Sequence, residues 1–252
     1  PMLDILNDRT PYNTAQNGLF TIKLTKQFSS KSFLEVNGSY IFDTWETNDG
    51  WFDDDWHSWY DSAAVYDHSL DLYGGDSSRA VEYRNAWQDK FGYVINGFPM
   101  ERNGNPRGLY GTGSQEGMEF GADYKGQFGR HHQVKIGGNF KTYTCRYFDI
   151  SPGVMVHTAP VGEDPGGYTS YGSIEDVPYF RWMSTGDVDA YGYDIYGNEI
   201  DERKDYYNED GELDGYAPAP KKPIEMAAYV MDKIEFNDLV INAGLRLDYF
   251  DP

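Results

Sequence analysis

The densest cluster of aromatic and acidic side chains lies in residues 51–60, which read Trp-Phe-Asp-Asp-Asp-Trp-His-Ser-Trp-Tyr. Aromatic faces flanked by carboxylates can bind sugars or a cationic ligand, because the negative face of the ring attracts positive charge. A loop that packs its own aromatic side chains and leaves its acids in solvent would have the same composition. Six residues of the segment are candidate ligand contacts: Trp51, Asp53, Asp54, Asp55, Trp56 and Trp59.

A second acidic segment, residues 187–201, spaces oxygen-bearing side chains with glycines between them. Calcium takes roughly six to eight oxygen ligands, and acids of an extracellular loop suit a weak site. If the carboxylates converge, their repulsion must be relieved by a cation, by solvent or by one of three nearby bases, Arg181, Arg203 and Lys204. The candidate calcium ligands are Asp187, Asp189, Asp194 and Asp201, although a solvated acidic loop explains the same pattern. The segment Asn208-Glu209-Asp210-Gly211-Glu212 has a similar composition.

Motifs for catalysis are missing from the sequence. It has no Gly-x-Ser-x-Gly nucleophile elbow, no His-Glu-x-x-His zinc motif and no phosphate-binding loop. The pair His131-His132 has no carboxylate or cysteine at ligand spacing, which predicts a solvent-exposed turn. Paired acids are expected by chance in a chain with 41 Asp and Glu. We therefore expect a protein that is not an enzyme and uses no cofactor beyond the calcium ion considered above.

The composition differs from that of an ordinary soluble core. Only 39% of the residues are apolar while 17% are aromatic, and the chain has 22 Tyr and 28 Gly. Such an aromatic excess is typical of transmembrane barrels, where aromatic girdles lie at both interfaces. The net charge of −20 argues against a nucleic-acid partner, because phosphate binding needs a basic surface. The single Cys145 excludes an internal disulfide.

Six segments alternate apolar and polar residues with a period of two, which predicts strands with two different faces. Several exceed ten residues, and a tilted strand needs about 9–11 to cross a bilayer. The one misfit is Asp232, which lies on an otherwise apolar face. We expect Phe120, Tyr124, Ile136, Phe140, Leu245 and Leu247 on one side of the sheet, with Glu119, Asp123, Lys135 and Arg246 on the other. The segments are residues 20–25, 34–43, 116–128, 133–145, 224–236 and 239–250.

The connections between these segments alternate in length. Three are short, at residues 29–32, 129–132 and 237–238, and two are long, at about residues 46–115 and 148–222. Long structureless loops are uncommon in compact domains, whereas short turns alternating with long outer loops are the rule in outer-membrane barrels. The long segments also hold most of the excess acid. The sequence thus predicts an all-β fold, a segment of an antiparallel transmembrane β-barrel with six strands in three hairpins and two long extracellular loops. A soluble β-sandwich is the alternative.

The last hairpin resembles one that recurs in TonB-dependent receptors. The resemblance is carried by Ala-Tyr-Val-x-Asp-Lys at residues 228–233 and Asn-x-Gly-x-Arg-x-Asp-Tyr at residues 242–249. Residues 120–124, Phe-Gly-Ala-Asp-Tyr, and residues 135–140, Lys-Ile-Gly-Gly-Asn-Phe, resemble the hairpin that precedes it in that family. The resemblance covers the three hairpins, and the long loops contribute nothing to it.

This resemblance implies a barrel of about 22 strands with an N-terminal plug, which imports a scarce nutrient across the bacterial outer membrane. The implied partners are outer-membrane lipid, the TonB complex acting through the plug, an unknown nutrient and a surface lipoprotein. The chain has six strands and no plug sequence, so we expect it to be part of a larger barrel domain that includes all of residues 1–252. Two alternatives stay open: a secreted or surface β-protein that binds carbohydrate through loop aromatics, and a β-rich glycosidase using two carboxylates.

Overall fold

The computed structural model describes residues 11–72, 74–78, 93–95, 98–100, 109–151, 171–185 and 188–252. The chain divides into two compact units. Unit 1 consists of Pro1–Thr14, Trp45–Gly113 and Tyr147–Ala219, and unit 2 consists of Ala15–Thr44, Ser114–Arg146 and Pro220–Pro252.

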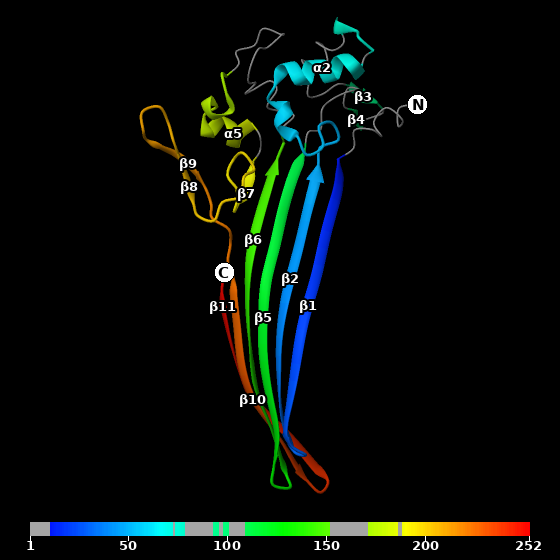
Figure 1. Ribbon diagram of the computed structural model, residues 1–252, viewed down its shortest axis with the longest axis vertical. Coiled ribbons are helices and arrows are strands. Elements are labelled where there is room, and N and C mark those ends of the chain that lie inside the picture. The colour runs from blue at the N-terminus through cyan, green and yellow to red at the C-terminus, as the bar shows by residue number, and fades with distance from the viewer. Residues whose placement is uncertain are drawn as a thin grey trace. The chain divides into compact units, whose positions relative to one another are not determined.

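Six long strands follow one another in a meander, so that neighbours in the chain are also neighbours in the sheet (Figure 1). Their order is β1-β2-β5-β6-β10-β11, and among the described residues β1 and β11 are the two edges of an open sheet. The all-β class and the six predicted strands are confirmed, and the first four are longer than their alternating segments. The strands are β1 (Tyr12–Ser29), β2 (Ser32–Asn48), β5 (Tyr110–Phe128), β6 (His132–Ile150), β10 (Ile224–Phe236) and β11 (Leu239–Asp251).

The three short turns all lie in unit 2, at residues 30–31, 129–131 and 237–238. Two of them use a left-handed backbone, at Gly129 (φ +64°) and Asn237 (φ +34°), the residue types that adopt this conformation most readily. The long connections lie in unit 1, apart from the last residues before β10. Unit 2 is therefore three β-hairpins, as the alternation of connection lengths predicted.

The register of β10 against its neighbours gives the sheet of unit 2 two distinct faces. Val230 lies opposite Ile136 on β6 and opposite Leu245 on β11, so one face carries a row of apolar side chains. The adjacent Tyr229 lies opposite Gly137 and Arg246, on the other face. Because side chains alternate along each strand, this register extends over the whole hairpin and confirms the predicted division of the strand residues.

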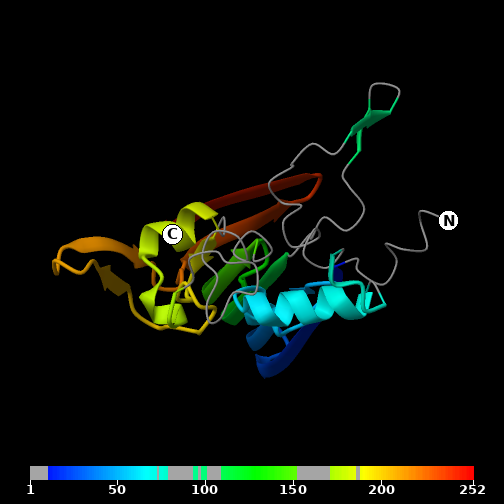
Figure 2. The same cartoon turned by 90° about the horizontal axis from the view of Figure 1, so that it is seen from above.

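Unit 1 contains shorter elements that the sequence pattern did not predict, and Figure 2 shows its helices and small strands. None of the described helices is long and apolar enough to cross a membrane. Strand β7 pairs with the end of β6, and β8 pairs with β9. The elements are η2 (Trp56–Trp59), α2 (Ser62–Leu72), β3 (Tyr93–Ile95), β4 (Phe98–Met100), η5 (Ile174–Asp176), α5 (Tyr179–Thr185), β7 (Asp189–Tyr191), β8 (Lys204–Tyr207) and β9 (Leu213–Ala217).

Helix α2 has clear start and stop residues. The Asp61 carboxylate accepts hydrogen bonds from the backbone N–H groups of Ala63 (2.9 Å) and Ala64 (3.3 Å), which makes Asp61 its N-terminal cap. The helix ends at two glycines with positive φ, Gly74 (+62°) and Gly75 (+89°). Local capping thus fixes this helix within a segment whose sequence shows little apolar periodicity.

Candidate membrane interface and loop sites

The apolar face of unit 2 is open to its surroundings. Ile22 is 70% exposed, and Phe20, Leu24 and Leu247 are each 67% exposed. Exposed apolar patches beyond a few hundred Å² are rare on soluble monomers and mark an interaction or membrane surface. The same face on the remaining strands adds further exposed side chains: Val36, Tyr40, Met118, Phe120, Ile136, Met226, Val230, Leu245 and Tyr249.

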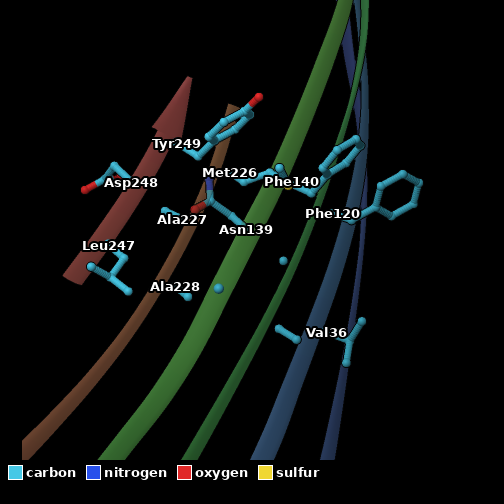
Figure 3. Close-up of a pocket in the computed structure, with 13 residues that line it drawn as sticks. Val36, Phe120, Asn139, Phe140, Met226, Ala227, Ala228, Leu247, Asp248 and Tyr249 are labelled. Atoms are coloured by element: carbon cyan, nitrogen blue, oxygen red, sulfur yellow. The ribbon is translucent and has the colours of Figure 1, made fainter. Parts of the chain in front are cut away.

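A shallow hollow of about 610 Å³ lies in this apolar face (Figure 3). Its floor is formed where small residues meet across three strands, at Ala122, Gly138 and Ala228. Larger apolar side chains surround the floor: Val36, Phe120, Phe140, Met226, Leu247 and Tyr249. Two charged or amide residues, Asn139 and Asp248, border the hollow, but the side chains on its own face are apolar. The hollow suits a hydrocarbon chain better than a polar ligand.

Three phenylalanines mark the turn end of this face. Phe28 precedes the last residue of β1, while Phe128 ends β5 and Phe236 ends β10. All three lie on the apolar side by the alternation of their strands, and they are 59%, 51% and 48% exposed, respectively. His131 stacks on Phe236 with ring centroids 5.0 Å apart. The first strand of every hairpin therefore carries an exposed aromatic ring at or next to its last residue.

The opposite face of unit 2 is polar and carries ion pairs between neighbouring strands. Lys23 of β1 lies 3.0 Å from Glu35 of β2. Asp123 and Glu119 of β5 face two lysines of β6: Lys135 is 3.6 Å from Asp123 and Lys141 is 3.6 Å from Glu119. Tyr229 of β10 donates a hydrogen bond to Asp123. These contacts balance the charge of the face locally, which is the arrangement expected for a wall that borders water.

Glycines on the polar face make room for these side chains. A Cβ atom at Gly137 would overlap the Asp123 carboxylate, and one at Gly121 would lie 3.1 Å or less from three side-chain atoms of Asn37. Gly117 holds the ring of Tyr143 in the same way. Each polar side chain lies across a glycine of the adjacent strand, so the abundance of glycine in the strands has a packing cause.

Asp232, the one acidic residue on the otherwise apolar face of β10, contacts a side chain that is far from it in the sequence. Its Oδ2 lies 2.7 Å from Nδ1 of His132, 100 residues away in the chain. The two side chains are 31% and 48% exposed and lie on the apolar face at its turn end. No carboxylate lies at ligand spacing from His132 in the sequence, but the antiparallel pairing of β6 with β10 brings Asp232 beside it. The exposed position of the turn itself is confirmed.

The residues of the aromatic and acidic segment 51–60 are divided between the core of unit 1 and its surface. Trp56 and Trp59 are 2% and 0% exposed, and they pack with Phe148 and Trp182 in the core of unit 1. Both rings are core residues of this structure, and their assignment as ligand contacts stays a prediction. Trp51 is half-buried and stacks on Trp59, with centroids 5.1 Å apart. The three predicted acids Asp53, Asp54 and Asp55 are exposed.

A buried carboxylate that sequence reasoning missed organises this segment. Asp49, which is 0% exposed, accepts hydrogen bonds from the backbone N–H groups of Trp51 (2.6 Å) and Phe52 (2.8 Å). Its second oxygen accepts one from Nε1 of Trp59 (2.7 Å). Burial raises the pKa of Asp49 above its ordinary value, against the lowering effect of these three hydrogen bonds. The carboxylate therefore has a structural role, with a desolvation cost that its partners only partly offset.

The predicted calcium ligands are placed unequally. Asp187 lies outside the described residues, while Asp189 and Asp201 are exposed. Asp194 is 2% exposed, and its carboxylate contacts Nζ of Lys204 at 2.7 Å and the amide nitrogens of Asn198. Lys204 thus supplies the positive charge that the sequence analysis required near these acids. Among the described residues no group of three or more His, Cys, Asp or Glu could hold a metal ion, so the four-carboxylate calcium site stays a prediction.

Comparison with known proteins adds no assignment: no protein-family model, curated protein or solved structure matches the chain.

Proposed function

We propose that the chain is part of an outer-membrane β-barrel of the TonB-dependent transporter type, which imports a scarce nutrient into a bacterium. The observation that carries this proposal is the location of the apolar side chains. Every buried hydrophobic residue of the described chain belongs to unit 1, whereas most of the large apolar side chains of unit 2 are exposed along one face, with four on the other: Leu19, Met231, Val240 and Phe250. A face of this kind is stable where its surroundings are themselves apolar, and a bilayer is such a solvent.

The length of the apolar face supports a membrane. On β5 the apolar side runs from Met118 to Phe128, a stretch of about 11 residues. At ~3.3 Å per residue and a tilt of ~45°, this stretch covers about 25 Å along the membrane normal, the height of the apolar band in outer-membrane barrels. The exposed rings of Phe28, Phe128 and Phe236 then form an aromatic girdle at one interface.

The polar face supports a water-filled interior on the other side of the wall. Its ion pairs between adjacent strands would be costly in hydrocarbon and are stable beside water. The edges of β1 and β11 are open among the described residues, and further strands of a larger barrel would pair with them. Coupling to TonB through a plug, and the identity of the nutrient, follow from the family resemblance alone. The acidic long segments, placed outside the cell, would repel an anionic ferric chelate within a Debye length of ~8 Å.

Site-specific labelling of one strand tests the membrane assignment. In a Cys145→Ala background, cysteines at Phe120 and at its neighbour Glu119 receive an environment-sensitive fluorophore, and the full chain is inserted into vesicles. The label at 120 should be quenched by a quencher attached to lipid chains, and the label at 119 by aqueous iodide. Equal quenching of both labels by the aqueous agent would contradict the membrane assignment, because the two positions differ only in the face of the sheet.

The transport assignment has its own test in the host cell. Removing the gene and removing TonB should impair growth on the same limiting nutrient to the same extent, with no further loss when both are removed. An effect of the gene that persists without TonB would leave the membrane barrel in place and exclude TonB-dependent transport.

A further inference from the structure

The β8–β9 hairpin of unit 1 has one face that packs on the protein and one that does not. Tyr206 and Gly215 lie opposite each other, and both face Tyr179 of α5. The rings of Tyr179 and Tyr206 stack with centroids 5.2 Å apart, and a Cβ atom at Gly215 would overlap the ring of Tyr179. Tyr179 also donates a hydrogen bond to the backbone oxygen of Tyr216 (3.1 Å). This face of the hairpin is therefore fixed to α5.

The side chains next to this packed face point outward and are large. Tyr216, opposite Asp205, is 46% exposed. Tyr207 and Leu213, which pair at the tip, are 63% and 53% exposed. We refer to Tyr207, Leu213 and Tyr216 as the outer patch. Exposed tyrosine is the side chain that contributes most often, with Trp and Arg, to protein–protein interfaces.

The charge around the outer patch is strongly acidic. Residues 201–217 contain seven acids and two bases, a difference of −5. Both bases are already engaged: Lys204 contacts Asp194 (2.7 Å), and Arg203 contacts Asp205 (2.6 Å) and lies over the ring of Tyr216 at 3.9 Å. The hairpin thus presents apolar and aromatic groups inside a negative field, which favours a partner with positive charge.

Hydrogen bonds within the chain form the turn at the tip of the hairpin in the absence of a partner. The side chain of Asn208 accepts a hydrogen bond from the N–H of Glu212 (2.8 Å), and the backbone N–H of Asn208 donates to the oxygen of Glu212 (2.9 Å). Gly211 adopts a left-handed backbone (φ +78°) and completes the turn. A preformed tip loses little conformational entropy on binding, which lowers the free-energy cost of docking.

We propose that the outer face of the β8–β9 hairpin is a docking surface for a basic, extended segment of a partner protein. Lysine or arginine side chains of that segment face Glu209, Asp210 and Glu212, and alternate apolar side chains contact the outer patch. Each strand of the hairpin has one strand neighbour among the described residues, so an extended segment can lie beside either strand. The area of one hairpin corresponds to a weak, transient complex.

A designed peptide tests this proposal with the full chain. The probe is a fluorescent peptide of alternating lysine and leucine, and its binding is followed by anisotropy at low and high salt. The double variant Glu209→Gln/Glu212→Gln should weaken binding about fourfold at low salt, because each exposed charge pair contributes a factor of about two. The matched control Asp67→Asn/Asp71→Asn removes the same charge from exposed sites of the same unit and should change binding less than twofold.

The apolar contribution has a separate readout. Tyr207→Ser/Leu213→Ser should weaken binding about tenfold at both salt concentrations, since this contact is not screened. Equal losses in the two charge variants would show attraction to net charge alone and overturn the proposal, as would unchanged binding by the Tyr207→Ser/Leu213→Ser variant. Millimolar calcium that displaces the peptide would assign the tip to a divalent ion instead. None of these outcomes depends on whether unit 2 lies in a membrane.

Discussion

Unit 1 buries its large apolar side chains, and unit 2 exposes them along one face. Phe148 of unit 1 is 0% exposed and lies among aromatic rings, whereas Phe120 of unit 2 is 55% exposed. Both residues lie on long strands of the same sheet. The two phenylalanines therefore differ in what surrounds their strands, a difference that the proposed membrane setting of unit 2 would explain.

This difference predicts which forces stabilise each unit. In unit 1 the removal of aromatic surface from water stabilises the fold, at roughly 25 cal/mol per Å². In unit 2 that contribution is small within the protein, and under the membrane proposal stability would come from the strand ladder, the interlocked polar face and contact of the outer face with lipid. The same substitution should then have different consequences in the two units.

The largest expected effect is a loss of folding stability in unit 1, and a matched pair of Phe→Ala substitutions tests it. Phe148→Ala should lower the free energy of unfolding of unit 1 by about 3–5 kcal/mol, because it leaves a cavity in a packed core. Phe120→Ala should cost about 1 kcal/mol or less in lipid, since the lost contacts are with hydrocarbon that can refill the space. The five tryptophans that the structure describes all lie in unit 1, so tryptophan fluorescence reports its unfolding in urea.

For Phe120→Ala the readout is the change in far-UV circular dichroism of the strands. A cost for Phe120→Ala as large as that for Phe148→Ala would mean that Phe120 lies in a protein core, and the contrast between the units would fail.

A charge placed on the apolar face gives the next largest effect. Leu245 is 63% exposed and lies in the middle of the apolar stretch of β11. Leu245→Arg should cost about 2–4 kcal/mol if the residue sits near the bilayer midplane. Asn242→Arg, on the polar face of the same strand, is the control and should be nearly neutral. The fraction of chain that resists protease in vesicles measures insertion, and equal insertion of both variants would show that the face is wrongly assigned.

Sequence patterns were sufficient to predict the strands and turns of unit 2 because short stretches of sequence determine them. Alternation along each strand and the lengths of three turns determine the two faces, and both are visible in short stretches of sequence. The start of β5 was missed because Tyr110-Gly-Thr-Gly-Ser114 has the composition of a turn. Its glycines are required by Trp45 of β2, whose ring lies about 3 Å from where Cβ atoms at Gly111 and Gly113 would be.

The structure of unit 1 was harder to predict because its contacts join segments that are far apart in the sequence. The composition of residues 51–60 fits a ligand site and a core equally well, and only the burial of Trp56 and Trp59 separates the two. The pairing of Asp194 with Lys204 likewise depends on the fold of a turn and a hairpin. Such contacts leave no periodic pattern, so the candidate site residues were predicted less well than the strands.

A smaller effect is expected from the buried carboxylate of unit 1. Asp49→Ala should lower stability by about 2 kcal/mol, because it removes three hydrogen bonds and leaves Nε1 of Trp59 buried without an acceptor. The folded-state pKa of Asp49 is raised by burial, so its protonated form favours the folded state. Parent stability should therefore fall as pH rises through that pKa, and Asp49→Asn should remove this part of the slope. Urea unfolding followed by tryptophan fluorescence at several pH values measures both effects, and an unchanged slope in Asp49→Asn would contradict the role of Asp49.

The smallest expected effect concerns Asp232, the one carboxylate on the otherwise apolar face of β10. Asp232 and His132 are both partly exposed, and pairs of this kind typically contribute about 0.2–1 kcal/mol. His132→Ala should cost no more than this in the parent, and nothing in an Asp232→Val background, where the partner is missing. Asp232→Val alone should be neutral or stabilising in vesicles, because it extends the apolar face toward the ring of Phe236. A four-variant cycle of insertion free energies gives the coupling directly. Strong destabilisation by Asp232→Val would place this end of the face in water rather than at a membrane boundary, and would shorten the apolar stretch of unit 2 at the turn end.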